Sequence, residues 1–204
     1  MKPLFITGIG TDVGKTIVSA ILVEKFKADY WKPIQSGELE NSDTRRVKSL
    51  ISNDVSAFYP EAYRLTQPFS PHKAAALDGI EIDITNIQLP ITSNRLLIEG
   101  AGGLMVPLNR KNHVIDLIEL FGAEVILVVR HYLGSINHTL LSIESLKNRK
   151  IPVKGIIING GEDVYSEQAI RDFCGTPLMG SIPSIKELTQ EQIIALGEYI
   201  NVDL

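Results

Sequence analysis

The sequence of 204 residues has little cysteine, few aromatic residues and no long apolar run. Its single cysteine, Cys174, cannot form an intrachain disulfide or a cysteine-based metal cluster, and such cysteine usage is typical of a reducing compartment. No apolar stretch reaches the length of about 18 residues that a transmembrane helix needs, and the first residues lack the apolar core of a signal peptide. These absences argue against a membrane span and against secretion, so we expect a cytoplasmic protein.

The chain also lacks an excess of basic residues. It has 20 Lys and Arg against 24 Asp and Glu, a formal net charge of −4 and a pI near 5.6. This balance removes the general electrostatic attraction for nucleic acid and leaves only a local basic patch open. We therefore expect neither nucleic acid nor a membrane as a partner. With 44% hydrophobic and 22% charged residues, the composition is that of a globular domain.

Short apolar runs alternate with amphipathic stretches along the whole chain. The runs predict strands over residues 4–7, 30–33, 95–99, 124–129, 153–159 and 178–182. The stretches between and after them predict helices over residues 16–27, 42–51, 70–77, 114–121, 135–148, 165–173 and 189–200. Such alternation predicts an α/β fold, a doubly wound and mostly parallel sheet with helices on both faces, and ligands beyond the carboxyl ends of the strands.

No repeat, low-complexity tract or flexible linker interrupts this pattern, so we expect a single domain over residues 1–204. The least regular region is residues 35–92, which contains two proline-interrupted helices and no clear strand. We interpret it as an insertion over the active face.

A glycine-rich loop, Gly-Ile-Gly-Thr-Asp-Val-Gly-Lys-Thr over residues 8–16, follows the first predicted strand and opens the first helix. Glycines let backbone N–H groups converge on an anion, Lys15 is placed to reach the β- and γ-phosphates, and Thr16 is placed to bind Mg²⁺. The spacing departs from the strict P-loop form, since five residues separate Gly8 from Gly14. It fits the dinucleotide-binding motif less well, and an ordinary βα turn is the remaining alternative. The strand–loop–helix context favours a P-loop NTPase fold.

Three further charged residues are candidates for the site, two at strand ends and one at a helix start. Glu99 follows an apolar strand and precedes Gly100, so next to a P-loop it is favoured as a Mg²⁺ ligand over a solvated strand end. Asp43 lies at a helix start, where a carboxylate interacts favourably with the helix dipole. The residues alone favour this local role over a role in ligand binding. Lys32 leaves the second predicted strand and is either a counter-charge for a phosphoryl group or a surface lysine, with neither favoured.

Several segments together resemble dethiobiotin synthetases. The matching segments occur in the family's order, cover nearly the whole chain and comprise residues 8–16, 32–37, 41–43, 99–103, 133–139, 155–159 and 199–201. Lys-Pro-Ile-Gln-Ser-Gly at 32–37 and Leu-Gly-Ser-Ile-Asn-His at 133–138 are the specific ones, since a P-loop alone is weak evidence. The resemblance implies an ATP- and Mg²⁺-dependent ligase of biotin biosynthesis. It joins CO₂ to 7,8-diaminononanoate as a carbamate, phosphorylates the carbamate and closes the ring to dethiobiotin, releasing ADP and phosphate.

The resemblance also implies the functional residues. Lys15 and Lys32 are the implied catalytic residues, Thr16, Asp43 and Glu99 the metal ligands, and Asn159 the adenine-reading residue. The implied nucleotide-binding residues are Asp12, Val13, Gly14, Lys15, Thr16, Ile17, Asp43, Glu99, Gly100, Ala101, Gly102, Asn159, Gly160, Pro183, Ser184 and Ile185. The implied substrate-binding residues are Thr11, Ser36, Gly134, Ser135 and Asn137, the last three from the second subunit of a homodimer with a shared active site.

Two alternatives remain, and the first comes from the same superfamily. A nucleotide-switched partitioning ATPase, which acts as a scaffold, usually has a second lysine early in its P-loop, and Gly10 stands there in this chain. Such proteins often end in a basic amphipathic helix, whereas residues 189–204 contain acidic residues and no Lys or Arg. An amidoligase of cobalamin synthesis normally needs a glutamine-hydrolysing domain, and Cys174 lies in no such motif. These features argue against both alternatives and favour the dethiobiotin synthetase interpretation.

Overall fold

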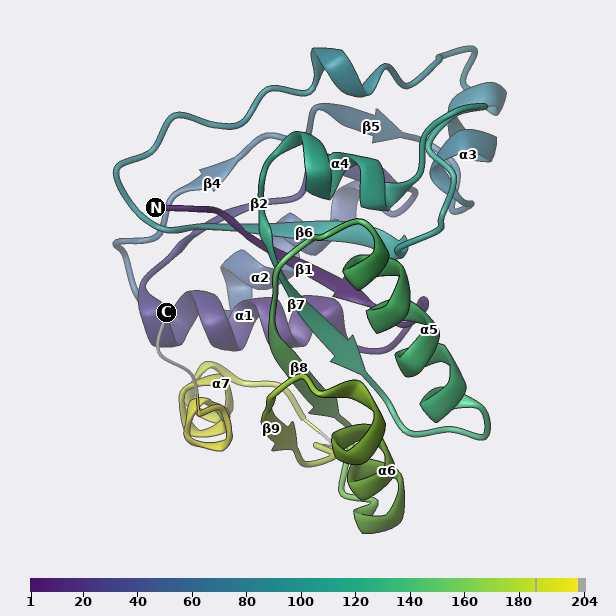
Figure 1. The fold of residues 1–204 in the computed structure, drawn as a ribbon. Coiled ribbons are helices and arrows are strands. Elements are labelled where there is room, and N and C mark those ends of the chain that lie inside the picture. Colours follow the sequence, from purple (N-terminus) through teal and green to yellow (C-terminus); the bar gives the residue numbers. More distant parts are fainter. Residues whose placement is uncertain (186, 202–204) are drawn as a thin grey trace.

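The computed structural model describes residues 1–185 and 187–201, and a seven-stranded sheet forms its centre (Figure 1). The strand order is β4-β2-β6-β1-β7-β8-β9, and every neighbouring pair in it is parallel. The strands are β1 (Leu4–Gly8), β2 (Asp29–Trp31), β4 (Phe58–Tyr59), β6 (Leu96–Gly103), β7 (Glu124–Val129), β8 (Val153–Asn159) and β9 (Leu178–Ile182). The predicted parallel α/β sheet is confirmed.

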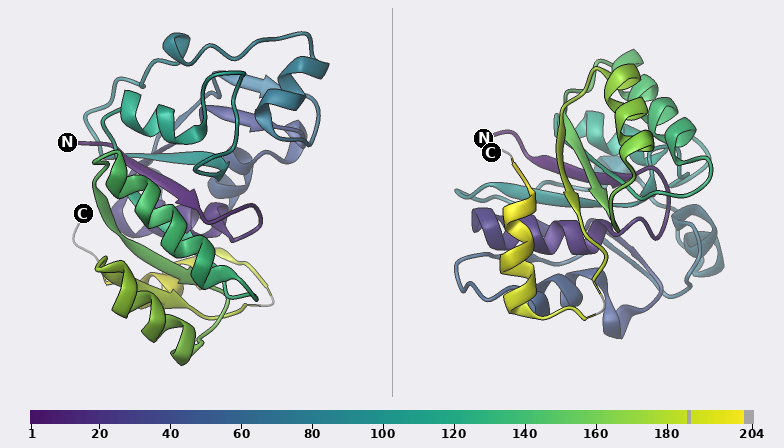
Figure 2. Two further views of the ribbon diagram at one scale, coloured as in Figure 1. Left: turned by 45° about the vertical axis from the view of Figure 1, so that its right-hand side comes forward. Right: turned by 90° about the horizontal axis from the view of Figure 1, so that it is seen from below.

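Helices cover both faces of this sheet (Figures 1 and 2). One face packs against α1 (Lys15–Phe26), α2 (Asp43–Leu50) and α7 (Gln190–Leu196). The other face carries α4 (Val114–Leu120), α5 (Ser135–Asn148) and α6 (Val164–Cys174). The helix predicted over residues 189–200 is shorter than expected, because α7 ends at Leu196 and a 3-10 turn over Gly197–Tyr199 follows.

The central strands are apolar throughout because both of their faces are covered. In β1 all five residues are buried, with Leu4 and Ile6 facing α1 while Phe5 faces the α4 side. Such strands read as continuous apolar runs rather than alternating ones, which made them recognisable in the sequence. Among the described residues, no helix combines the length and the apolar character needed to cross a bilayer.

The region over residues 35–92 corrects the sequence-based interpretation, which expected no strand there. β3 (Ile34–Ser36) and β5 (Tyr63–Leu65) form a small second sheet, and β4 extends the edge of the main sheet beside β2. Helix α3 (Pro71–Leu77) follows, with Pro71 at its first turn as predicted, and two 3-10 turns lie at Leu39–Asn41 and Ile84–Asn86. The strands β3, β4 and β5 have two or three residues and show no periodicity of their own, so pairing with distant partners reveals them.

Strand β6 also differs from the prediction, because it does not end at Glu99. It continues through the glycines to Gly103, which pairs with Gly8 of β1 after a shift in register. Glu99 pairs with Ile6 in the interior of the sheet. Its carboxylate is therefore held inside the molecule, on the face of the sheet that α1 covers.

Candidate active site

The loop between β1 and α1 turns tightly around its own backbone. Asp12 and Gly14 both have positive φ angles, of 56° and 93°, and α1 begins immediately after Gly14. A Cβ atom on Gly14 would collide with the side chain of Asn159, whose Nδ2 donates to the carbonyl of Val13 at 3.0 Å. Glycine at this position thus permits the close approach of β8 to the loop. The Lys15 ammonium donates to the Gly10 carbonyl at 3.0 Å, across the concave side of the loop.

Three oxygen-bearing side chains converge at the start of α1. The Thr16 hydroxyl lies 2.8 Å from Asp43 Oδ1 and 2.9 Å from Glu99 Oε1. Thr16 comes from α1, Asp43 from the first turn of α2 and Glu99 from β6, and Glu99 is only 1% exposed. Asp43 therefore does begin a helix, as the local interpretation expected, but its carboxylate also faces the P-loop. Glu99 is not a solvated strand end.

Lys32 lies between the two carboxylates. Its ammonium is 2.6 Å from Asp43 Oδ2 and 3.2 Å from Glu99 Oε1, and the residue is 5% exposed. Burial lowers the pKa of Lys32, but Glu99 and Asp43 outweigh that effect and raise it. In return, Lys32 and the Thr16 hydroxyl lower the pKa of Asp43 against the opposing effect of its burial. Lys32 is thus a charged group of the site and not a surface lysine.

The second lysine has the opposite shift. Burial lowers the pKa of Lys15, Glu99 partly offsets this, and the nearby charge of Lys32 lowers it further. Two ammonium groups and two carboxylates therefore share one partly desolvated region. A polyanionic ligand that binds beside Lys15 would supply a negatively charged partner for its ammonium group.

These groups open into a pocket of about 890 Å³. The predicted site residues that line it are Thr11, Asp12, Gly14, Lys15, Thr16, Ile17, Lys32, Ser36, Asp43, Glu99, Ala101, Gly102 and Asn159. The irregular region over residues 35–92 contributes another wall through residues 35, 36, 38 and 68–71. This placement agrees with the expectation that residues 35–92 lie over the active face.

The other predicted nucleotide-binding residues are not among those that line this pocket, namely Val13, Gly100, Gly160, Pro183, Ser184 and Ile185. The Gly160 N–H donates to the Ile182 carbonyl at 2.9 Å, and the Ser184 hydroxyl donates to the Gly160 carbonyl at 2.6 Å. These bonds hold the segment after β9 beside the end of β8. Ile185 instead packs against the apolar core on the α1 side.

The two residues predicted to bind the reacting end of the substrate differ in environment. The Ser36 hydroxyl oxygen is buried at the pocket and has no hydrogen-bond partner among the described residues. A buried hydroxyl without a partner is costly, so a ligand that bonds to it gains that interaction. Thr11 is exposed and lines two pockets, the one just described and a smaller one.

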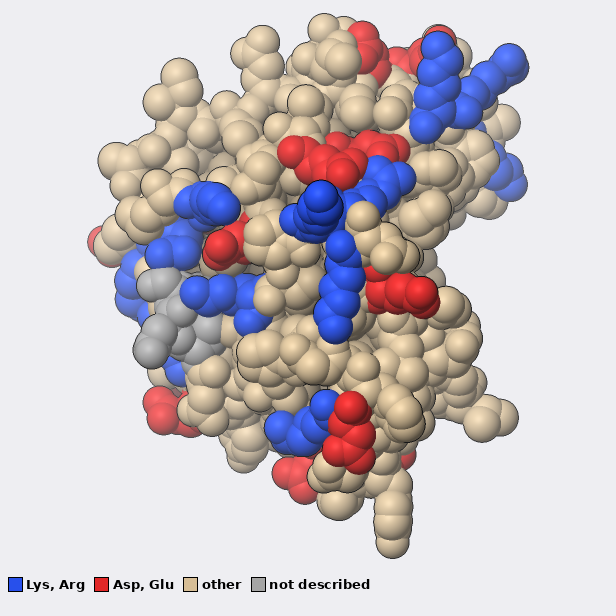
Figure 3. All heavy atoms as spheres, in the orientation of Figure 1, with Lys and Arg blue, Asp and Glu red and all other residues tan. Residues whose placement is uncertain are grey.

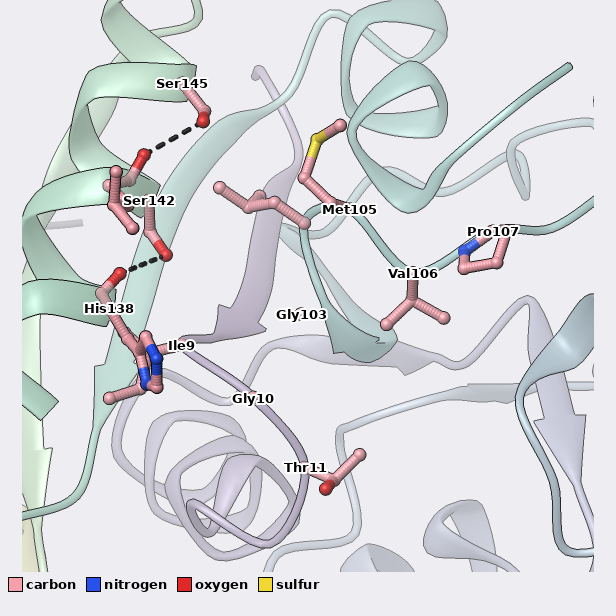
Figure 4. A pocket seen from close by; sticks show the side chains of 12 residues that line it. Ile9, Gly10, Thr11, Gly103, Met105, Val106, Pro107, His138, Ser142 and Ser145 are labelled. Carbon is pink, nitrogen blue, oxygen red and sulfur yellow. Dashed lines mark hydrogen bonds between the residues drawn. The ribbon is translucent and has the colours of Figure 1, made fainter. Parts of the chain in front are cut away.

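The smaller pocket, of about 380 Å³, lies between α5 and the loop after β6. Figure 4 shows His138, Ser142 and Ser145 on the α5 wall and Met105, Val106 and Pro107 opposite them. Of the described residues that line either pocket, none belongs to 134–137. Within one chain the structure therefore does not bring Gly134, Ser135 and Asn137 to the lysines; Ser135 is buried and Asn137 is exposed at the start of α5.

Three polar residues near the site were missed by the sequence analysis. Tyr30 donates to Glu99 Oε2 at 3.0 Å, and its burial, followed by the Glu99 charge, raises its pKa well above the usual value. Gln35 is 5% exposed and its Oε1 accepts from the Asp43 N–H at 3.4 Å. Arg130 donates to the Asp12 carbonyl at 3.3 Å. Arg130 follows β7 directly, so the rule that ligands lie beyond strand ends offered a signal for it.

The charged surface around these elements is mixed. On the face shown in Figure 3, acidic and basic side chains are interspersed over the molecule. Lys32 of the site is instead paired with the buried Glu99 and the half-buried Asp43, within a few ångströms.

The chain is similar to proteins of known activity. A family model described as an AAA domain matches residues 2–192. The ATP-dependent dethiobiotin synthetase BioD of Christiangramia forsetii is 58% identical over 89% of this chain and 87% of that protein. The protein with the same name from Cytophaga hutchinsonii is 50% identical over 96% and 95% of the two chains.

Solved structures share the fold at lower identity. The cell division ATPase MinD of Pyrococcus furiosus has a TM-score of 0.59 and 12% identity, and the comparison covers 98% of each chain. A ParA family ATPase from Chlorobium tepidum has a TM-score of 0.54 and 12% identity, with 98% of this chain and 100% of that chain covered. These likenesses show the P-loop NTPase fold alone. The much higher identities above favour the synthetase over the partitioning alternative.

Proposed function

The chain belongs to the ATP-dependent dethiobiotin synthetase family, and from that premise we propose how its own residues carry out the ligase reaction of biotin biosynthesis. One amine of 7,8-diaminononanoate attacks CO₂ and loses a proton, which gives a carbamate. A carbamate oxygen attacks the γ-phosphorus of ATP and ADP leaves. The second amine then attacks the carbamoyl carbon, phosphate leaves, and the ring closes to dethiobiotin. Such chemistry needs positioned reactants and neutralised charge more than a strong acid or base.

The observation that carries this proposal is the placement of Lys15 and Lys32 in one pocket with the start of α1. Lys15 is inside the curve of the P-loop, where it neutralises the β- and γ-phosphates. Lys32 lies beside Asp43 and Glu99, so that its charge faces the phosphoryl group and the carbamate during transfer. Both charges stabilise the transition state best in a desolvated pocket, where Coulombic interactions are least screened.

The residues around Thr16 fit a Mg²⁺ ion. One hydroxyl oxygen and two carboxylate oxygens meet there, and all three are hard ligands. The described residues contain no group of three or more His, Cys, Asp or Glu side chains that could hold a metal ion. Mg²⁺ in nucleotide sites takes one or two carboxylates and completes its shell with phosphate oxygens and water. We propose that Thr16, Asp43 and Glu99 hold it. The ion, when bound, neutralises phosphate charge.

The remaining pocket residues bind the rest of the two substrates. Ser36, with its unpartnered hydroxyl, and Thr11 hydrogen-bond the reacting end of the diamine. Asn159 and the backbone over residues 183–185 bind adenine beside the end of β8. The predicted loop residues from Asp12 to Ile17 and from Gly100 to Gly102 surround the phosphates.

We further propose a homodimer whose partner subunit binds the distal carboxylate of the diamino acid. Gly134 starts α5 with a φ of 106°, and the free N–H groups of that helix end suit a carboxylate. The exposed position of Asn137, away from the lysines of its own chain, supports a contribution across an interface. We also propose that the chain is one domain, because strands from both ends enter one sheet, and that it acts in the cytoplasm.

Subunit mixing tests the shared site. Lys15→Ala and Asn137→Ala are each expected to be nearly inactive, and in a mixed dimer one site keeps both residues while the other has neither. Random exchange makes about half of the dimers mixed, so about a quarter of wild-type activity returns. No return of activity, after tagged subunits have shown exchange, or a monomer in sedimentation at assay concentration would reject the shared site.

The reaction itself is tested by substrate dependence. Phosphate release from ATP with Mg²⁺ is expected to be slow alone and to rise strongly with diaminononanoate and bicarbonate, with dethiobiotin detected by mass spectrometry. Equal phosphate release with and without the diamine, and no cyclic urea, would contradict the proposed function.

A further inference from the structure

Tyr30 is a fully buried phenol whose hydroxyl contacts the proposed metal ligand Glu99. The residue has no exposed surface, and its hydroxyl donates to Glu99 Oε2 at 3.0 Å. The other carboxylate oxygen, Oε1, faces the Thr16 hydroxyl at 2.9 Å and the Lys32 ammonium at 3.2 Å. The two oxygens of Glu99 therefore have separate sets of partners, one toward the ligand pocket and one toward Tyr30.

The sheet explains why the phenol reaches this carboxylate. Strands β2 and β6 are parallel neighbours with Tyr30 opposite Leu97, so Glu99 lies two residues farther along, on the same face. Lys32, two residues after Tyr30, follows the same alternation and reaches Glu99 from its other side. The Phe58 ring of β4 packs against the Tyr30 ring with 5.7 Å between centroids. This packing leaves the phenol little freedom to turn away.

Loss of this hydroxyl has a defined consequence for Glu99. Of the described residues, Tyr30 alone donates to Oε2, and the carboxylate is 1% exposed, so water does not easily replace the bond. Without the Tyr30 hydroxyl, the carboxylate is held through Oε1 alone, by Thr16 and Lys32, and its orientation about the terminal bond is less restricted. A change in that orientation alters the direction in which Oε1 faces Thr16, where the oxygen is proposed to meet the metal.

We infer that Tyr30 is a positioning residue, whose hydroxyl orients the Glu99 carboxylate so that Oε1 faces the Mg²⁺ site at Thr16. The inference rests on the proposed function of Thr16, Asp43 and Glu99 as metal ligands. Partners of metal ligands typically change metal affinity by about 10- to 100-fold when they are removed, since they fix the direction of the ligating atom. Tyr30→Phe is therefore expected to weaken metal binding without touching the nucleotide.

Tyr59→Phe provides a matched control. The Tyr59 hydroxyl also donates to a buried carboxylate, Asp29 Oδ2, at 3.0 Å, and it does so on the neighbouring strand β4. Asp29 is not among the residues that line the nucleotide pocket. Both variants lose one hydroxyl from one tyrosine–carboxylate pair, so a general effect on packing or folding appears in both. Only Tyr30→Phe is expected to change the metal site.

The test measures Mn²⁺ binding in the presence of saturating ADP by electron paramagnetic resonance, with Mn²⁺ standing for Mg²⁺. We expect about 10-fold weaker Mn²⁺ binding in Tyr30→Phe, wild-type binding in Tyr59→Phe and equal metal-free ADP affinity in all three proteins. The rate of dethiobiotin formation by Tyr30→Phe is expected to recover when Mg²⁺ is raised, which a folding defect would not allow. Mn²⁺ affinity within twofold of wild type, or an equal loss in both variants, would overturn the inference. If the wild-type protein forms no dethiobiotin, the proposed function is wrong. The Mn²⁺ measurement tests the role of Tyr30 independently of that result.

A second measurement needs no Tyr30 variant. The chain has six tyrosines, and labelling of the ring carbon that bears the hydroxyl with ¹³C gives one resonance for each, assigned by replacing the others with phenylalanine. Addition of Mg²⁺ to the ADP complex is expected to shift the Tyr30 resonance and leave that of Tyr59 in place. A Tyr30 resonance that does not respond to Mg²⁺ would reject a link between this phenol and the metal site.

Discussion

Glu99 and Glu24 are both buried carboxylates on the α1 side of the sheet, yet they are held in different ways. Glu24, near the end of α1, accepts from the backbone N–H groups of Ser52 and Asn53 at 2.8 and 3.1 Å and from the Lys27 ammonium at 2.6 Å. The hydrogen bonds to Glu99 from the described residues come from the side chains of Thr16 in α1, Tyr30 in β2 and Lys32 directly after β2. Two of the five hydrogen bonds to Glu24 come from backbone N–H groups, and the others come from the Lys27, Ser52 and Asn53 side chains. Among the described residues, every hydrogen bond to the Glu99 carboxylate comes from a side chain.

This difference fits a structural role for Glu24 and the proposed functional role of Glu99. Backbone N–H donors are part of the chain path after α2, so Glu24 cannot exchange them for a ligand without unfolding that segment. Lysine and threonine side chains can turn toward a phosphate or a metal while the backbone stays in place. The partners of a buried carboxylate thus distinguish a group that stabilises the fold from one that is available for chemistry.

The largest expected effect comes from removing the charge of Lys32. Lys32→Met keeps an apolar side chain of similar length, and we expect dethiobiotin formation to fall by about 10³-fold, as when a transition-state charge partner is lost. Lys27→Met is the matched control, because it removes the lysine from Glu24 instead and is expected to keep the wild-type rate. Similar turnover in the two variants would show that the lysine beside Glu99 has no special role.

The next largest effect is expected when the Glu99 carboxylate is replaced by the amide of the same shape. Glu99→Gln is expected to lower turnover by about 100-fold and to raise the Mg²⁺ concentration needed for half-maximal rate, because a neutral amide oxygen is a weaker Mg²⁺ ligand. Its melting temperature is expected to stay within a few degrees of wild type. Steady-state rates across a Mg²⁺ series, beside thermal melts, check this. Unchanged Mg²⁺ dependence would remove Glu99 from the proposed metal site.

Glu24→Gln is expected to show the reverse pattern. Replacing the carboxylate loses the charge-assisted bonds from Lys27 and the loop after α2, and we expect a fall of about 2 kcal/mol in the free energy of unfolding. Turnover per folded molecule is expected to match wild type. Urea unfolding and active-site titration measure the two quantities. A loss of turnover without a loss of stability would contradict the structural role of Glu24.

The contribution of Glu24 to stability is expected to depend on pH. Burial raises the pKa of Glu24, but the hydrogen bonds from Lys27, Asn53 and Ser52 outweigh it and lower the pKa to about 2 from 4.5. Because the folded-state pKa is the lower one, the stabilisation is fully present above pH 4.5 and is lost as the pH falls toward 2. The difference in unfolding free energy between wild type and Glu24→Gln is therefore expected to shrink from pH 5 to pH 3. A difference that grows on acidification would reverse the sign of the argument.

The smallest effect is expected at the exposed end of the Glu24 cluster. The Lys27 side chain is 50% exposed, so its ion pair with Glu24 is screened and Lys27→Met is expected to cost about 0.5 kcal/mol. High salt is expected to remove most of that difference. Urea unfolding at low and high ionic strength measures it, and a cost as large as that of Glu24→Gln would mean that Lys27 rather than Ser52 and Asn53 holds this carboxylate.

Much of the fold was predictable from the sequence. The helix over residues 135–148 was predicted with its observed bounds, and the strands over 124–129, 153–159 and 178–182 likewise. Hydrophobic periodicity reports these elements because it depends on residues a few positions apart. The P-loop was recognised for the same reason, since its glycines, Lys15 and Thr16 follow one another along the chain.

The site itself was only partly predictable from the residues. Local patterns left Lys32 open between two roles and favoured a helix-start role for Asp43, until the family resemblance pointed to both. Nothing in the pattern around Tyr30 indicated a partner for Glu99. The short strands β3, β4 and β5 were missed because each is held by a partner elsewhere in the chain.

The sequence by itself determined the longer strands and the helices, in their order, and the loop that begins α1, since local spacing and apolar patterning suffice for both. The tertiary structure decided which side chains meet there. Thr16 reaches Asp43 across 27 positions and Glu99 across 83, while Lys32 and Tyr30 reach Glu99 across 67 and 69. Those meetings depend on the strand order, which makes β2 and β6 neighbours, and strand order is set by packing over the whole sheet and not by any local run of residues.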